Sequence, residues 1–168
     1  LDELRTEIGF LFQGSALYDS MSVRENLEFP LRRHTKKFGI IEDTTPLVME
    51  ALESVGLAHA IDLMPNELSG GMKRRIALAR TLILKPKIIL YDEPTTGLDP
   101  ITSKEIVLLM NSVQKKYNTS SIIITHDVDC AKVIANRMIL LIDGVNYIEG
   151  TFGELSSSTD PKVQAFFK

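Results

Sequence analysis

The sequence has little of what a secreted or membrane-spanning chain needs. Its 168 residues include one cysteine, Cys130, so no disulfide can form within the chain. The neighbours Ala131, Val133 and Ile134 form an apolar pattern that favours a packed helix over a reactive thiol. No apolar run approaches the roughly 20 residues that span a bilayer, and the opening LDELRTEIGF has no signal-peptide pattern. We therefore expect a reducing, cytoplasmic setting, in which the protein could still dock on a membrane protein.

A surplus of positive charge is also absent. Lysine and arginine together number 19 against 22 aspartates and glutamates, which gives a net charge of -3 at pH 7. Nucleic-acid binding through a generally basic surface is therefore not expected, because such binding neutralises many phosphates. With 44% hydrophobic and 24% charged residues, the chain has the composition of one globular domain that buries about two thirds of its unfolded surface.

Short apolar runs alternate with longer helical patterns along the chain. Strands are predicted at 8–13, 88–93, 121–126 and 138–143. Three of these runs are almost continuously apolar, as in a parallel sheet covered on both faces. A short antiparallel partner is predicted at 145–150, joined through the turn at Asp143 and Gly144.

Helical patterns fill the intervals between the predicted strands. Helices are predicted at 48–55, 71–84, 101–116 and 128–135. The interval between Gln13 and Lys85 holds no convincing strand and is interpreted as a mostly helical insertion. Strands that alternate with helices indicate an α/β fold.

Ser69, Gly70 and Gly71 stand directly before an apolar-periodic run. If Ser69 caps a helix there, its hydroxyl and the free N–H groups of the first turn lie at the positive end of the helix dipole, and the glycines allow close approach of a ligand. That arrangement describes a phosphate site. The alternative from these residues alone is a Ser-capped amphipathic helix whose basic residues, Arg74 among them, lie on a solvated face away from the apolar stripe.

Two adjacent carboxylates, Asp92 and Glu93, end the predicted strand IILYDE. The carboxyl edge of a buried strand is where open α/β sheets place ligands. Apolar residues followed by an acid form the Walker B arrangement, in which an aspartate holds magnesium against nucleotide phosphates. A second acid can orient or deprotonate the attacking water. The alternative is a charged strand end that enters a turn.

Taken in order, these motifs resemble the nucleotide-binding subunits of ABC transporters. LSGGM at 68–72 is similar to the signature motif, IILYDEPTTGLDP at 88–100 to Walker B and the D-loop, and IIITHD at 122–127 to the segment of the switch histidine. Gln13 matches the Q-loop glutamine. The resemblance covers nearly the whole chain and implies a P-loop NTPase-type parallel sheet flanked by helices, with an inserted helical subdomain.

The resemblance also implies a domain organisation. Residues 1–168 would form a single partial ABC ATPase domain, with its α/β core at 1–13 and 85–168. The helical subdomain, which includes the signature motif, would occupy 14–84.

The resemblance assigns catalytic and metal roles to four residues. Asp92 would support Mg²⁺, and Glu93 would polarise the hydrolytic water. His126 would contact the γ-phosphate and help to hold that water. Gln13 would sense the metal and link it to the transmembrane partner. The implied cofactors are ATP and Mg²⁺.

Other residues would act across a dimer seam. Ser69, Gly70 and Gly71 would clasp the γ-phosphate of an ATP molecule bound mainly by a second copy of the subunit. Asp99, in the D-loop, would carry signals across that seam, and it could also be the N-cap before Pro100. The implied assembly is a homodimer docked on a permease.

The sequence as given contains no G-x-x-x-x-G-K-[ST] segment, the P-loop that cradles phosphates. We interpret the chain as truncated before the Q-loop, with the N-terminal part of the fold missing. The missing strand should leave an apolar, unpaired edge in the sheet, and such edges invite association. The 168-residue chain itself is therefore expected to bind ATP weakly and not to hydrolyse it.

The subtype resembles the Mla-type ATPases that move phospholipid between bacterial membranes. The match includes Met72, where glutamine is commoner, and the ending DPKVQAFFK. The protein would then lie peripherally on the inner face of the cytoplasmic membrane. Leu17, Tyr18, Met21 and Val23 are candidates for the surface that meets the permease, or they pack the insertion onto the sheet.

Two alternatives remain at this stage, and a third is excluded. An ABC importer ATPase for another substrate would share every motif. A degenerate, non-catalytic remnant could bind a partner through its helical half. A DNA-repair ATPase would insert a long coiled coil between the Q-loop and the signature, and the absence of sustained heptads there excludes that architecture.

Overall fold

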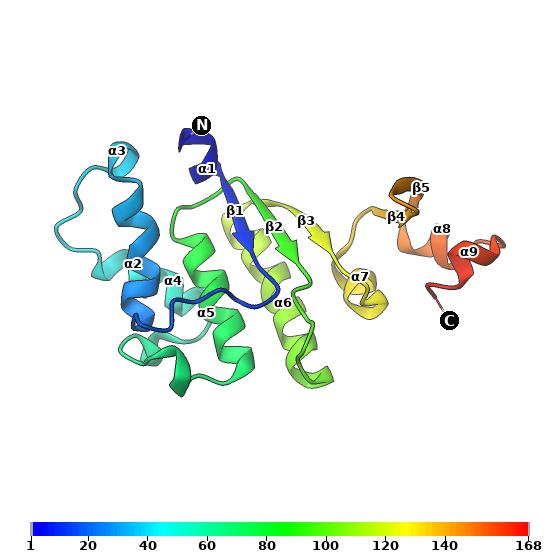
Figure 1. The fold of residues 1–168 in the computed structure, drawn as a ribbon. Helices are drawn as coiled ribbons and strands as arrows, with labels where there is room; N and C mark the ends of the chain where they lie inside the picture. Colours follow the sequence, from blue (N-terminus) through cyan, green and yellow to red (C-terminus); the bar gives the residue numbers. More distant parts are fainter. Residues whose placement is uncertain (1, 168) are drawn as a thin grey trace. The chain divides into compact units, whose positions relative to one another are not determined.

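The structure, a computed structural model, describes residues 2–167, with the side chains at positions 2, 3, 5, 36 and 37 outside the description (Figure 1). The chain divides into two compact units, Leu1–Ile124 and Thr125–Lys168. Among the residues described, none of the helices is both long enough and apolar enough to cross a bilayer.

The first unit is built on a parallel sheet. Its strands are β1 (Ile8–Leu11), β2 (Ile88–Asp92) and β3 (Ser120–Ile124), in the spatial order β1-β2-β3. Ile8 lies opposite Ile88, and Ile88 lies opposite Ser120. The predicted α/β fold and the first three predicted strands are confirmed, with carboxyl ends one or two residues earlier than expected.

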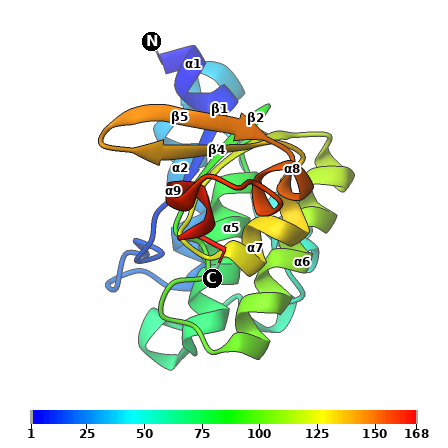
Figure 2. The same cartoon turned by 90° about the vertical axis from the view of Figure 1, so that its right-hand side faces the viewer.

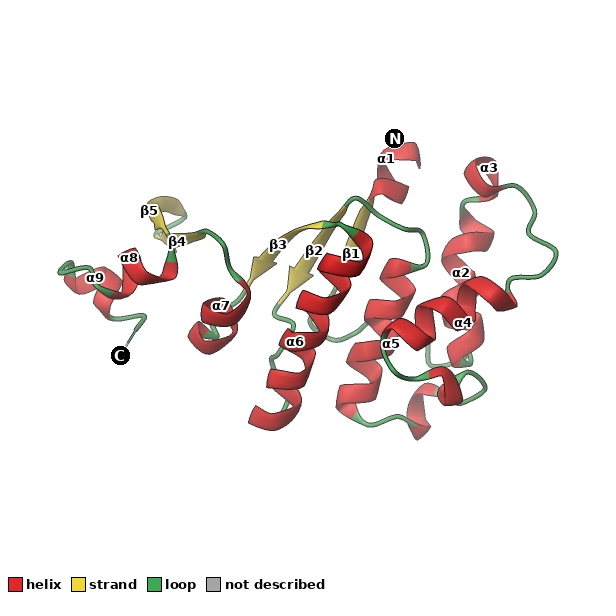
Figure 3. Ribbon diagram, turned by 180° about the vertical axis from the view of Figure 1, so that it is seen from behind, coloured by secondary structure: helices red, strands yellow, loops and turns green. Residues whose placement is uncertain are grey.

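Helices and the loops that join them make up the rest of the first unit (Figure 3). They are α1 (Asp2–Glu7), α2 (Val23–Arg33), α3 (Thr35–Phe38), α4 (Thr45–Ser54), α5 (Gly70–Leu82) and α6 (Pro100–Tyr117), with 3₁₀ turns η1 (Ala58–Ala60) and η2 (Pro65–Glu67). The described residues between positions 14 and 84 form no strand, in agreement with the predicted helical insertion. The predicted helices at 48–55, 71–84 and 101–116 correspond to α4, α5 and α6.

The core of the first unit lies around α5. This helix contacts α2, α4, α6 and β1. Ile76 and Leu78 of α5 are almost completely buried, as are Leu27 of α2 and Leu52 of α4. Each such side chain contributes about 1.5–3 kcal/mol by leaving water. The helix that begins at the predicted signature motif is therefore the central packing element of the unit.

The two faces of the sheet differ in exposure. Ile89 and Tyr91 of β2 are buried, whereas their neighbours on the other face are not. Phe10 shares a row with Ile122 across β2, and these side chains are 42% and 60% exposed. Within the described residues β3 is an edge strand, and its Ile124 is 62% exposed. The predicted apolar, unpaired edge is thus present on β3.

The second unit contains a hairpin and three short helices (Figure 2). Its elements are α7 (Val128–Ile134), β4 (Met138–Ile142), β5 (Val145–Gly150), α8 (Phe152–Ser156) and α9 (Pro161–Gln164). The strands pair antiparallel through Asp143 and Gly144, whose φ angles of 51° and 78° suit a tight hairpin turn. The predicted antiparallel partner and the predicted helix at 128–135 are confirmed.

Candidate functional site

Three of the predicted site residues leave neighbouring strands at the same edge of the sheet. β1 ends at Leu11, which lies opposite Tyr91 of β2. Gln13 therefore follows β1 at the edge where Asp92 ends β2 and Glu93 begins the next turn. The strands point the same way, so this is the carboxyl edge, where open α/β sheets bind ligands (Figure 1).

The backbone turns sharply at Glu93. Its φ angle is 46°, in the left-handed region that non-glycine residues seldom adopt. The amide N–H of Glu93 donates to the carbonyl oxygen of Ile124 at 2.9 Å, and its carboxylate accepts from the hydroxyl of Thr96 at 3.1 Å. Strained conformations persist where the surroundings hold them, and they cluster at functional sites. The side chain is partly buried, as is that of Asp92.

Gln13 lies in the loop that follows β1, and its side chain is exposed. The amide of Ser15 donates to the carbonyl of Phe12 at 3.0 Å, which closes the loop around Gln13. Ser15 and Ala16 then adopt φ angles of 64° and 47°. Two consecutive non-glycine residues with positive φ make this the most unusual backbone of the described chain, and they lie within three residues of a predicted ligand.

Ser69 caps α5, as predicted. Its hydroxyl accepts from the amide of Met72 at 3.2 Å, and both Ser69 and Gly70 are exposed. A Cβ atom at Gly71 would lie 2.7 Å from the Cγ2 atom of Thr102, so the absence of a side chain lets the first turn of α5 approach α6 closely. The start of α5 thus combines exposed backbone N–H groups with a positive helix end, which can bind an anion.

Asp99 caps α6. Its carboxylate accepts from the amides of Ile101 and Thr102, each at 3.0 Å, and from the Thr102 hydroxyl at 2.5 Å. The Thr102 hydroxyl is the largest cause that holds the pKa of Asp99 below its usual range, with the backbone amides adding to it. Asp99 is therefore a structural cap, and because Thr102 also touches Gly71, the two helix starts form one cluster. A signalling role for Asp99 stays a prediction.

His126 belongs to the second unit. It follows the end of β3 by two residues and is exposed. The next residue, Asp127, caps α7 by accepting from the amide of Cys130 at 2.9 Å, and its own amide donates to the Thr125 hydroxyl at 3.0 Å. These bonds fix the backbone on both sides of His126. Its role toward a phosphate stays a prediction.

The interpretation of Arg74 as part of a solvated basic face is wrong. Arg74 is 5% exposed, and its guanidinium donates to the carbonyls of Phe12 at 2.9 Å and Thr96 at 3.2 Å. The sequence did contain a signal for this burial. Arg74 precedes the buried Leu78 and Leu82 by four and eight residues, so it lies on the same face of the helix as they do. Thr96, which contacts Glu93, was also missed, and no sequence pattern distinguishes it.

In the described part of the chain, no group of three or more His, Cys, Asp or Glu side chains is arranged to hold a metal ion. Magnesium commonly takes one or two protein oxygens and completes its octahedron with water and phosphate oxygens. Asp92 and Gln13 supply a carboxylate and an amide oxygen at one edge of the sheet. This donor set fits magnesium.

Comparisons with known proteins agree with the motifs. The profile of the family described as ABC transporter matches residues 1–96. The "Intermembrane phospholipid transport system ATP-binding protein MlaF" of Haemophilus influenzae is 41% identical over 100% of this chain and 63% of its own length. The "Probable ribonucleotide transport ATP-binding protein mkl" of Mycobacterium leprae is 39% identical over 99% of this chain and 47% of its own length.

A solved structure of the same fold is also similar. It is the dimer of the ATP-binding cassette MJ0796 in a post-hydrolysis state bound to ADP and Pi, which is 33% identical with a TM-score of 0.75. The alignment covers 90% of this chain and 67% of that one. The chain thus spans between about half and two thirds of the length of these relatives. The family profile covers more than half of the chain, and the resemblance found in the sequence is confirmed: this chain belongs to the ABC transporter family, as part of its ATP-binding domain.

Proposed function

We propose that this chain is part of an ATP-hydrolysing subunit that drives an ABC transporter. The observation that carries the proposal is the carboxyl edge of the sheet, where Asp92 ends β2 and Glu93 follows it beside the loop of Gln13. The backbone at Glu93 is strained, and two hydrogen bonds hold it, one at its amide and one at its carboxylate. Strained turns of this kind cluster at functional sites. The family and the ADP-bound relative support ATP as the ligand.

The proposed chemistry divides between these side chains. Asp92 and Gln13 would hold Mg²⁺, which when bound neutralises charge on the phosphates. Glu93 would accept a hydrogen bond from the attacking water and orient it, while Thr96 keeps the carboxylate in place through their 3.1 Å bond. His126 would donate to the terminal phosphate. Each role needs only hydrogen bonding or charge, which these groups supply.

The second half of the site would come from another copy of the subunit. Ser69 and Gly70 are exposed at the start of α5, where they are free to meet a phosphate on a facing surface. The related cassette MJ0796 forms a dimer with ADP and Pi. A head-to-tail homodimer would set the α5 start of each chain against the nucleotide bound at the sheet edge of the other, with Asp99 at the seam.

The first test is Glu93→Gln in the protein expressed from its complete gene. Glutamine keeps the size of the side chain and can still accept from Thr96, but it is a poor base. We expect ATP turnover to fall about 10²-fold or more, with ATP binding retained. Turnover is measured by phosphate release, and binding by equilibrium dialysis.

Glu53→Gln is the matched control, because Glu53 is exposed on α4. It should leave turnover unchanged. Undiminished turnover in Glu93→Gln would remove Glu93 from the mechanism, and a wild-type protein without turnover would favour a non-catalytic interaction module.

Phospholipid is the proposed cargo. The proposal rests on the name of the Haemophilus relative, which aligns with the whole of this chain. The name of the Mycobacterium relative, at similar identity, favours a ribonucleotide as the second candidate. ATP turnover by the purified transporter in vesicles, with each compound supplied in turn, separates the two: the true cargo should raise turnover, and the other should not.

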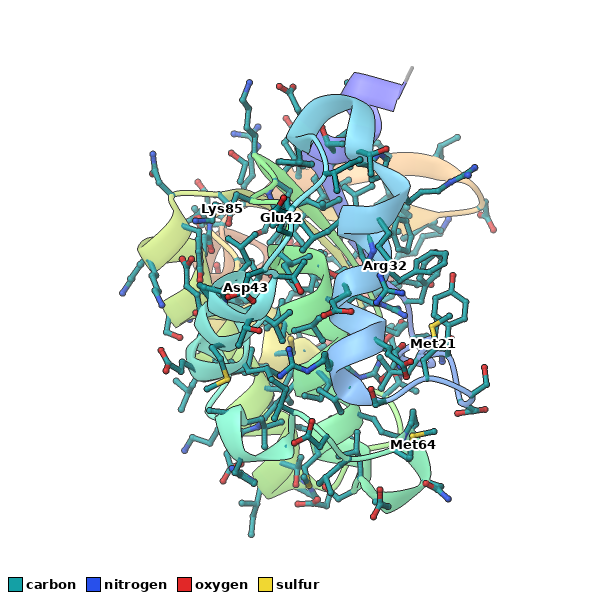
Figure 4. All side chains as sticks on the ribbon, turned by 90° about the vertical axis from the view of Figure 1, so that its left-hand side faces the viewer. Met21, Arg32, Glu42, Asp43, Met64 and Lys85 are labelled. Atoms are coloured by element: carbon teal, nitrogen blue, oxygen red, sulfur yellow. The ribbon has the colours of Figure 1, made fainter. Side chains whose placement is uncertain are left out.

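The permease would dock on the helical part of the first unit. The rings of Tyr18 and Phe29 contact each other there at a tilt of 51°, with centroids 4.8 Å apart, and the side chains are 43% and 36% exposed. Figure 4 shows Met21 and Met64 near the start of α2, where the amide of Val23 donates to the carbonyl of Leu63. Aromatic and methionine side chains are enriched at protein interfaces. Docking would hold the subunit on the cytoplasmic face of the membrane.

The four residues predicted for the docking surface differ in their exposure to solvent. Val23 is completely buried and belongs to the core, whereas Tyr18 is exposed and Leu17 and Met21 are partly exposed. The candidate docking surface therefore consists of Leu17, Tyr18, Met21 and Phe29.

A further inference from the structure

A buried arginine joins three segments of the candidate site. Arg74 lies on α5, five residues after Ser69, and its side chain is almost completely out of water. Its NH1 group donates to the carbonyl of Phe12 at 2.9 Å, and its NH2 group donates to the carbonyl of Thr96 at 3.2 Å. Phe12 precedes Gln13 directly. One guanidinium thus touches the loop of Gln13 and the turn that follows Glu93.

Each of these contacts continues to a side chain of the site. The Phe12 carbonyl also accepts from the amide of Ser15, so the bond from Arg74 falls on the turn that encloses Gln13. Thr96 donates its hydroxyl to the Glu93 carboxylate at 3.1 Å and its amide to the Glu93 carbonyl at 3.3 Å. Arg74 therefore fixes both turns through backbone carbonyls, those of Phe12 and Thr96.

A second arginine of the same helix holds the other end of the Gln13 loop. Arg80 donates to the carbonyls of Ala16 at 2.8 Å and Ser15 at 3.1 Å. These are the two residues with positive φ, and a left-handed backbone persists where its surroundings hold it. The loop from Phe12 to Ala16 is thus bonded at both ends to α5, the helix that Ser69 caps.

The chemistry of these contacts requires arginine. A guanidinium carries several donors in a rigid plane and can reach two carbonyls at once, whereas an ammonium group is a single point charge. No carboxylate among the described residues forms an ion pair with Arg74, so the buried charge is compensated by carbonyl oxygens alone. Burying a cation in that way is unfavourable unless the bonds are kept.

We propose that Arg74 is a positioning residue, which ties the Gln13 loop and the Glu93 turn to α5 so that the phosphate-facing end of this helix and both turns keep one geometry. The proposal rests on the proposed ATPase function for its consequence, although not for its structural content. Arg80 supports the same linkage at the far end of the loop.

The test compares Arg74→Met, Arg74→Lys and Arg75→Met in the protein expressed from its complete gene. Arg75 is the matched control, because it follows Arg74 on α5 but pairs with Glu105 at 2.8 Å, away from both turns. Hydrogen exchange is measured on peptides that cover 12–16 and 93–98, and kcat and KM are measured for ATP.

In Arg74→Met we expect amides of both segments to exchange about tenfold faster or more, because two charge-assisted bonds are lost. We expect kcat to fall about 10²-fold through misplacement of the reacting groups, while KM for ATP changes little. Arg74→Lys can keep one of the two hydrogen bonds, so only one segment should exchange faster. Its kcat should lie between those of the wild-type protein and Arg74→Met.

Exchange in both segments at the wild-type rate in Arg74→Met would overturn the proposal, as would an equal effect of Arg75→Met. If Arg74→Met does not fold, the one-segment response of Arg74→Lys decides the matter, and an unchanged or uniform response in that variant counts against the proposal. If the wild-type protein hydrolyses no ATP, the proposed function fails, and hydrogen exchange alone still decides the positioning role.

Discussion

Asp99 shows how one carboxylate can serve a fold and a candidate site together. It accepts from two backbone amides at the start of α6 and from the Thr102 hydroxyl. Thr102 in turn limits how closely α5 can approach, because its methyl group faces Gly71. A change in the charge of Asp99 would therefore be felt at both helix starts.

The loss of folding stability at acidic pH should depend in part on Asp99. Hydrogen bonds, first that from the Thr102 hydroxyl, lower its pKa in the folded protein. A lowered folded-state pKa adds stability above the unfolded value of about 3.9, and that stability is lost as pH falls through the folded value. In Asp99→Asn the amide still caps the helix, so the variant should be less stable than wild type at pH 7 and should approach it at about pH 3.

Urea denaturation midpoints at the two pH values measure this difference. Asp62→Asn removes an exposed carboxylate elsewhere and is the control. A gap between Asp99→Asn and wild type that stays constant from neutral to acidic pH would show that the charge of Asp99 has no part in stability.

Sequence reasoning succeeded for residues whose role is local. The sequence allowed Ser69 and Asp99 to be helix caps, and the structure shows that both are, because a cap bonds to amides two or three residues away. Arg74 was misjudged, since its partners lie 62 and 22 residues distant. Contacts at that separation depend on how α5 packs against the sheet, which the helical pattern alone does not determine.

At the scale of elements, β1 and α5 approach each other closely at Gly9. A Cβ atom there would lie 2.4 Å from the Cγ2 atom of Thr81 and 3.2 Å from the Cγ atom of Pro86. Thr81 cannot turn away freely, because its hydroxyl donates to the carbonyl of Ala77 at 2.9 Å. Strand β1, which leads to Gln13, can therefore pack this closely against α5 because Gly9 has no side chain.

Gly9→Ala should lower the free energy of unfolding by about 1–3 kcal/mol, the usual effect of overpacking. Gly14→Ala is the control, since a Cβ atom at Gly14 would meet nothing within 4 Å, and its effect should stay within about 0.5 kcal/mol. Chemical denaturation measures both. Equal effects in the two variants would mean that the contact with Thr81 yields without cost.

Element types were predictable where the pattern was strong. The apolar runs gave β1, β2 and β3, and the Asp143-Gly144 pair gave the hairpin of β4 and β5. The helix α2 was not delimited, because Pro30 falls inside it and interrupts the pattern that usually marks a helix. Its capping box between Ser22 and Glu25 was the available signal for its start.

At the scale of the assembled transporter, the docking surface of Leu17, Tyr18, Met21 and Phe29 allows a direct test. Asp19 is exposed within this stretch, whereas Glu25 is unsuitable for charge reversal because it belongs to the capping box of α2. Asp19→Lys should weaken co-purification with the permease about tenfold or more, through reversed charge at a close contact. The measurement is the fraction of permease retained on the tagged subunit.

Glu53→Lys makes the same charge change on the exposed side of α4 and should retain the permease fully. If both variants lose it equally, net charge rather than this surface governs assembly. ATP turnover of the isolated subunit should be the same in both variants.

The family could be predicted from the sequence because five short motifs occur in a fixed order, which chance rarely produces. What could not be predicted is the division of the chain after Ile124, since the run that ends β3 continues into Thr125 and His126 without a composition change. The unpaired edge on β3 was expected from the strand that the family resemblance implies is missing, and not from the apolar run itself.

The buried Cys130 gives this protein a built-in probe of its own motion. It is the chain's sole sulfhydryl, it lies on α7 and it is 2% exposed. An alkylating reagent can reach it only when that helix opens, so the labelling rate of unmodified protein reports the opening equilibrium. Binding of any molecule that steadies α7 would slow the labelling, with no engineered dye or tag required.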